Sequence, residues 1–89
     1  MNTYHLTIAS PDGNAFEGEA ISLIVRGVEG DLAIMADHAP FITALVPCHV
    51  KLLIPGEEGE SERHGIARGG LLSVSQNKVV LLSASFHWE

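Results

Sequence analysis

The feature of this sequence that most restricts its fold is the placing of apolar residues at every second position, in short runs separated by glycine or proline. In "TYHLTIA", Tyr4, Leu6 and Ile8 share one phase, which is typical of a strand with one buried face. No window of helical length shows the spacing of an amphipathic helix, and nine glycines and four prolines interrupt the 89 residues. We therefore predict one all-β domain over residues 1–89, an antiparallel β-sandwich or flattened barrel of about ten short strands.

The ends of individual strands are also predicted. "SPDGN" after the first strand is typical of a turn, and a change of phase near Ala20 indicates a bulge or break. "FITAL" and "HVKLLIP" are expected as two strands separated at Pro47, followed by a solvated hairpin tip at "PGEEGESER". In "VVLLSASF" both phases are apolar at first, which predicts a strand covered on both faces.

Composition excludes several classes of protein. A hydrophobic share of 46% argues against disorder, and a net charge of -6 with scattered basic residues argues against a nucleic-acid partner. The start has no signal-peptide pattern, and the longest uncharged runs, 39–50 and 79–88, fall short of the roughly 20 apolar residues that span a bilayer. We therefore expect no direct membrane insertion. Cys48 is the only cysteine, so no disulfide can form within the chain.

Residues that could carry chemistry are present but poorly arranged. No two histidines stand at the HxH or HxxxH spacing, and no cysteine pair accompanies them, so we expect no metal site and no cofactor. Cys48 and His49 are neighbours on a predicted strand and point to opposite faces, which prevents them from pairing. Asp31, Asp37 and His38 could act as acid and base, but no nucleophile lies near them in sequence. We predict no catalytic residue, which favours a binding or structural role over an enzyme.

Three segments, taken in order, resemble the N-terminal β-sandwich domain of the epsilon subunit of F-type ATP synthases. They are "YHLTIASPDGNAFEGEAISLIVRG", "GVEGDLAIMADHAPFITAL" and "GIARGGLLSVSQNKVVLLSAS". The sequence departs from the family pattern at Ala36 and Asp37, where Pro-Gly is usual, at Cys48, where glycine is usual, and at Arg68, where a small residue is usual. A glycine at the position of Asp37 suggests a positive φ, which aspartate tolerates better than most residues.

The resemblance implies a mechanical function. The epsilon subunit belongs to the central stalk, or rotor, and couples the gamma subunit to the c-subunit ring so that ion translocation drives ATP synthesis. The chemistry lies on the alpha and beta subunits of the head, which epsilon affects indirectly, so this chain is expected to be a non-catalytic accessory subunit. The implied location is peripheral, at the cytoplasmic face of a bacterial inner membrane. The family usually continues into a C-terminal helical hairpin, which we expect to be absent from residues 1–89.

The resemblance also implies which surfaces meet partners. Residues 31–38 are expected to form an exposed rim whose apolar side chains a partner covers. The residues implied to contact the c-subunit ring are Asp31, Leu32, Ile34 and Met35. The residues implied to contact the gamma subunit are Ser10, His38 and Thr43.

Two other classes of function stay open from the residues alone. One is a lipoyl-type carrier or another ligand-binding β-sandwich module. Such a carrier presents a lysine at a hairpin tip, whereas Lys51 lies within a predicted strand and Lys78 lies beside an ordinary turn. The other is a small hydrolase that uses Cys48 or the Asp37–His38 pair.

Overall fold

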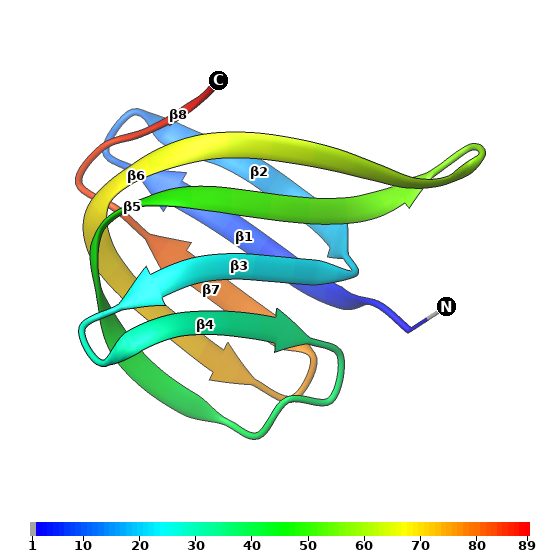
Figure 1. Cartoon of the computed structure of the whole chain (residues 1–89), viewed down its shortest axis with the longest axis horizontal. Helices are drawn as coiled ribbons and strands as arrows, with labels where there is room; N and C mark the ends of the chain where they lie inside the picture. Colours follow the sequence, from blue (N-terminus) through cyan, green and yellow to red (C-terminus); the bar gives the residue numbers. More distant parts are fainter. Residues whose placement is uncertain (1) are drawn as a thin grey trace.

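The computed structural model describes residues 2–89 and contains eight β-strands and no helix within them (Figure 1). The strands are β1 (Tyr4–Ser10), β2 (Gly13–Ala20), β3 (Ser22–Gly27), β4 (Gly30–Met35), β5 (Phe41–Gly56), β6 (Gly59–Ser75), β7 (Lys78–Leu82) and β8 (Phe86–Trp88). The predicted all-β class is confirmed. The number of strands is eight rather than about ten. One reason is that β5 continues through Pro47, where a break was predicted.

The strands are hydrogen-bonded in the order β2-β1-β7-β6-β5-β3-β4, and β8 pairs with β6. Among the strand pairs of the described residues, β1–β7 alone is parallel; the other pairs are antiparallel. The long strands β5 and β6 bend round one side of the molecule and take part in both layers of the sandwich (Figure 1). Residues 71–75 of β6 pair with β7 in one layer, and residues 65–67 pair with β8.

The prediction of two strands separated at Pro47 is wrong. Pro47 lies inside β5, opposite Arg68 of β6. The register between β3 and β5 jumps from Ile24–Lys51 to Gly27–Leu45, so residues 46–50 of β5 have no partner in β3. Proline has no N–H to donate to a neighbouring strand, and β3 is not paired with β5 at Pro47. The hairpin tip predicted at "PGEEGESER" is confirmed in its position. It is shorter than predicted, since only residues 57–58 form the turn.

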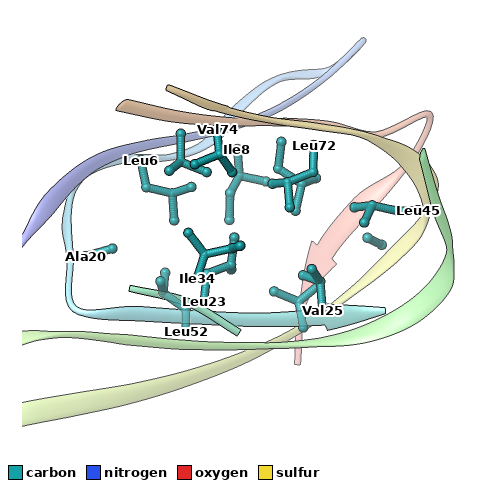
Figure 2. Close-up of a cluster of buried hydrophobic side chains, with 14 of the residues drawn as sticks. Leu6, Ile8, Ala20, Leu23, Val25, Ile34, Leu45, Leu52, Leu72 and Val74 are labelled. Atoms are coloured by element: carbon teal, nitrogen blue, oxygen red, sulfur yellow. The ribbon is translucent and has the colours of Figure 1, made fainter. Parts of the chain in front are cut away.

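The core lies between the two layers and follows the predicted period of two. Tyr4, Leu6 and Ile8 are buried, as expected for the first strand. Figure 2 shows Leu6 and Ile8 directed from one layer toward the side chains of the other. The buried hydrophobic residues are Tyr4, Leu6, Ile8, Ala20, Leu23, Val25, Ile34, Leu45, Val50, Leu52, Ala67, Leu72, Val74, Val79 and Leu81.

Two further local predictions have different outcomes. The break near Ala20 is confirmed: β2 ends there, and the N–H of Ile21 donates to the carbonyl of Leu53 before β3 begins. The expectation that β7 is covered on both faces is wrong. Val79 and Leu81 are buried, but Leu82 is 49% exposed because, among the described residues, a second layer covers only one face of this sheet.

Candidate partner-binding surfaces

β3 and β4 form a hairpin that is closed by a tight turn. Gly30 has a φ of 126°, a conformation that L side chains rarely adopt. Gly27 is buried, and a Cβ at this position would lie 3.1 Å from Cδ1 of Leu32. The two glycines therefore allow the tight turn that places Val28 and Glu29 at the tip. Val28 is 60% exposed, so the end of the hairpin presents an apolar side chain to solvent.

The residues expected at the ring contact divide between two faces of β4. Asp31 and Met35 point outward and are exposed, whereas Leu32 is half-buried against the core. Ile34 is fully buried, so its predicted exposure is wrong. The cause is the register of β4, which sets Ile34 opposite the buried Leu23. Because side chains alternate along a strand, the run "LAIM" presents only its second and fourth residues to solvent.

Asp31 is engaged within the hairpin. Its Oδ1 accepts a hydrogen bond of 2.8 Å from Nε of Arg26, the residue opposite it on β3. This bond, together with the guanidinium charge, lowers the pKa of Asp31. Both side chains are more than half exposed. The hairpin therefore presents an ion pair to solvent, and a basic partner of Asp31 must share the carboxylate with Arg26.

The three residues expected to contact the gamma subunit lie at separate places. Ser10 ends β1, and its hydroxyl accepts a hydrogen bond from the N–H of Asp12. His38 follows β4, with its ring 5.0 Å from the ring of Phe41. Thr43 is half-buried and lines a groove with Gly27. The structure therefore does not bring these three side chains into one site.

The position of His38 is fixed by a reciprocal contact beside it. Oδ1 of Asn77 accepts a hydrogen bond of 2.7 Å from the N–H of Asp37, and Nδ2 of Asn77 donates to Oδ1 of Asp37 at 3.0 Å. Both residues have positive φ, 65° at Asp37 and 50° at Asn77, which confirms the conformation expected at Asp37. The contact holds the β4–β5 loop against the β6–β7 turn.

An exposed apolar surface that the sequence interpretation missed lies on the outside of β5, β6 and β7. We call it the outer apolar face; its members are the exposed Ile42, Leu71 and Leu82 and the half-buried Val80. Leu71 and Leu82 are directly paired across β6 and β7, and they are 44% and 49% exposed. Ile42 is 68% exposed and shares a register row with Val80 through Ser73. The signal was present in the second apolar phase of "VVLLS", but it was interpreted as internal burial.

The outer apolar face is bordered by two of the predicted contact residues. Ser10 and Leu82 line the same shallow hollow at one end of β7. At the other end, Asp37 bonds to Asn77, which immediately precedes β7, and His38 lines a hollow with Asn77. Ser10 and His38 therefore mark opposite ends of this face.

Among residues 2–89, the neighbours Cys48 and His49 point to opposite faces of β5. Cys48 is half-buried against the core and His49 is exposed, which is the opposite orientation that strand geometry predicts. No group of three or more histidine, cysteine, aspartate or glutamate side chains in this part of the chain could hold a metal ion. No helix in the same residues is long and apolar enough to cross a membrane.

The fold and these surfaces define a class: a small β-sandwich domain with exposed apolar surfaces suited to protein partners. Residues 3–89 match the family model of the ATP synthase delta/epsilon chain β-sandwich domain. The chain belongs to this family, which forms a non-catalytic part of the ATP synthase.

Curated relatives support the same family. The chain is 37% identical over 83 residues to the ATP synthase epsilon chain of an Exiguobacterium strain, covering 93% of this chain and 59% of the relative. It is 31% identical over 88 residues to that of Caldicellulosiruptor saccharolyticus, covering 99% and 61%. The chain therefore spans about three fifths of the length of these relatives.

Solved structures show the same fold. A chain of the OSCP/F1/c-ring part of the Euglena gracilis mitochondrial ATP synthase matches with a TM-score of 0.84 and 18% identity, covering 97% of this chain and 53% of that one. A chain of the central stalk and c-ring of the Tetrahymena thermophila mitochondrial ATP synthase matches with a TM-score of 0.77 and 15% identity, covering 93% and 64%.

Proposed function

We propose that this chain is the β-sandwich domain of an epsilon subunit in the rotor of an F-type ATP synthase. In this role it couples the gamma subunit to the c-subunit ring, so that ion translocation drives ATP synthesis in the catalytic head. It works from the cytoplasmic face of a bacterial inner membrane, as a peripheral part of the complex. Family membership supports the complex, and the outer apolar face is the observation that carries the role in assembly.

The gamma subunit is the proposed partner of the outer apolar face. This face spans neighbouring strands of one layer, so its side chains are held by a hydrogen-bonded sheet. Covering a Leu or Ile side chain fully contributes on the order of 1.5–3 kcal/mol before the costs of association. Ser10 and His38 border the face and contribute polar contacts at its edge, as the rim of an interface usually does. Thr43 contributes from the groove beside Gly27.

The tip of the β3–β4 hairpin is the proposed contact with the c-subunit ring. Val28 supplies an exposed apolar group at the end of the hairpin. Asp31 and Met35 extend the contact along the outward side of β4, and Leu32 supports it from the groove. The carboxylate of Asp31 serves orientation more than affinity, because exposed charges mainly influence encounter.

Paired substitutions separate the two contacts. Ile42→Asp places a charge on the outer apolar face, and Val28→Asp places one at the hairpin tip; both positions are exposed, so both variants are expected to fold. We expect Ile42→Asp to lose gamma in co-purification, whereas Val28→Asp keeps gamma and loses the ring from the gamma–ring complex. Each variant is the control for the other, with thermal unfolding as the check of folding. Normal assembly by both folded variants would show that these surfaces are not the contacts.

The carrier alternative receives less support from the structure. Lys51 lies within β5, where its Nζ is 3.3 Å from Oε1 of Glu62, and it does not stand at a hairpin tip. Lys78 is the first residue of β7 and pairs with Ser75 across the strand. Neither lysine is presented at the end of a projecting turn, as a carrier lysine must be to visit other sites.

A further inference from the structure

The free edge of β4 carries a row of unpaired backbone groups. β4 pairs with β3 on one side, and no other strand of residues 2–89 pairs with it. Gly27 and Gly30 flank the two-residue turn and form a hydrogen-bonded pair, from which hydrogen-bonded and non-hydrogen-bonded pairs alternate along the hairpin. The N–H and C=O groups of Asp31, Ala33 and Met35 therefore point away from β3, toward the free edge.

The other edge strand, β2, is protected against further pairing, whereas β4 is not. The register of β2 against β1 shifts between Ile8 and Ala9, and the side chains of Glu17 and Glu19 are exposed along β2. Bulges and charged side chains are common means of protecting an edge strand. β4 has no shift in its register with β3, and its sequence "GDLAIM" contains neither proline nor lysine. The edge of β4 is thus open to an additional strand.

An apolar groove lies beside this open edge. Its volume is about 330 Å³, and Leu32 of β4 lines it together with Phe41 and Ile42 of β5. In Figure 1 the start of β5 runs below β4, on the side away from β3. Residues directly opposite each other on neighbouring strands share one face of the sheet. A strand added to β4 would therefore direct the side chains opposite Leu32 and the buried Ile34 toward this groove.

We propose that the edge of β4 and the adjoining groove bind an extended segment of another protein as an additional antiparallel strand. The backbone groups of Asp31, Ala33 and Met35 supply the hydrogen bonds, and the groove selects apolar side chains at alternate positions. These are the two components from which strand addition obtains its affinity and its specificity. The support for this inference is independent of the proposed rotor function, which uses side chains of the same hairpin.

The charges along the edge define the occupant. Glu29 and Asp31 lie at one end and Asp37 follows the other, while Arg26 on the neighbouring strand already bonds to Asp31. A segment with a basic residue opposite Asp31 is complementary to this edge. A second copy of this chain is not, because pairing two β4 strands along their full length about Ala33 sets Glu29 opposite Asp37 of the other copy. Like charges directly opposite each other are destabilising.

A synthetic peptide and the 89-residue chain test the proposal. The probe is an acetylated and amidated hexapeptide, Thr-Val-Thr-Val-Lys-Thr, whose valines face the groove and whose lysine lies opposite Asp31. In amide NMR spectra we expect saturable shifts at millimolar peptide, largest at Asp31, Ala33 and Met35. Replacing the lysine by glutamate should weaken binding about fivefold at low salt. Replacing both valines by serine should abolish binding.

Hydrogen bonding through the edge can be tested on both molecules. Ala33→Pro removes a donor that points away from β3, so we expect the variant to fold and to lose the peptide. Ala33→Ser keeps the N–H and is the matched control, which should bind as the wild type does. N-methylation of the third peptide residue, which lies opposite Ala33, should also abolish binding. N-methylation of the fourth residue, whose N–H points away from β4, should not, and this pair of peptides needs no variant of the chain.

Several results would overturn the proposal. They are undiminished binding by a folded Ala33→Pro variant, equal binding of the two methylated peptides, peptide-induced shifts confined to β2, and no saturable shifts at millimolar peptide. Shifts in β4 that depend on the concentration of the chain alone would show that a second copy, rather than a basic segment of another protein, occupies the edge.

Discussion

At the scale of single residues, the structure shows how one substitution in a family pattern is accommodated. Asp37 stands where the resemblance implied a glycine, and its φ is 65°. Asp37 and Asn77 are joined by two hydrogen bonds, one of them to the aspartate carboxylate. Because Asn77 also has a positive φ, these bonds stabilise two residues in an unfavourable backbone conformation. The sequence indicated the positive φ. It did not indicate the partner, because Asn77 is 40 residues away and is brought there only by the fold.

Two substitutions at Asp37 separate strain from hydrogen bonding. Asp37→Ala keeps the unfavourable φ and removes the bond from Asn77, so we expect a loss of about 1–3 kcal/mol in the free energy of unfolding. Asp37→Gly loses the same bond but relieves the φ restriction, so it should be less destabilising than alanine. Urea denaturation of the two variants and the wild type measures the difference. A glycine variant that is less stable than the alanine variant would contradict this account.

At the scale of strands, the sequence predicted the period but not the continuity or the register. The buried phase of β1 followed directly from Tyr4, Leu6 and Ile8, because alternate residues of a strand share one face. Ile34 was assigned to an exposed rim because it lies in a run of four apolar residues, and only its pairing with Leu23 places it in the core. The strand break predicted at Pro47 is wrong, because the sequence does not show that β3 leaves residues 46–50 of β5 unpaired.

The His49–His64 contact shows the same limit. Nε2 of His49 lies 3.0 Å from Nδ1 of His64, but the two residues are 15 positions apart, so no local sequence pattern predicts their contact. They become neighbours only when the β5–β6 turn is placed at residues 57–58, which sets Lys51 opposite His64 and His49 opposite Ile66. Register, rather than residue type, was therefore the missing information.

A hydrogen bond between the layers gives a prediction about β4, which lies at one end of the strand order. The hydroxyl of Tyr4 donates to the carbonyl of Ile34 at 2.8 Å, and burial raises the pKa of this hydroxyl, so it remains a donor. Tyr4→Phe leaves that carbonyl without its partner, and we expect a loss of about 1–2 kcal/mol in the free energy of unfolding. Amide exchange in β4 should accelerate more than in β2. Unchanged stability and unchanged exchange in β4 would show that the bond is unimportant.

At the scale of the whole molecule, the domain has a well-packed interior and apolar residues on separate outer surfaces. Leu6, Leu52 and Leu72 are fully buried, while Ile42 and Val28 are more than half exposed. Apolar groups of this size that remain in water mark partner surfaces when they cluster. The proposed rotor role requires this combination, because such a domain must be rigid and must hold two partners at once.

We propose that the outer apolar face binds the gamma subunit, and the calorimetric affinity of the chain for purified gamma tests this proposal. In Leu71→Ser/Leu82→Ser, two paired leucines that are 44% and 49% exposed lose their apolar groups. The exposed areas of the two side chains together equal roughly that of one leucine, whose burial at an interface contributes about 1.5–3 kcal/mol. Losing this contribution lowers the affinity for gamma about tenfold or more. Ile24→Ser, an exposed aliphatic position on β3, is the matched control and should bind as the wild type does. An unchanged affinity in the folded double variant, or no binding of gamma by the wild-type chain, would contradict the claim.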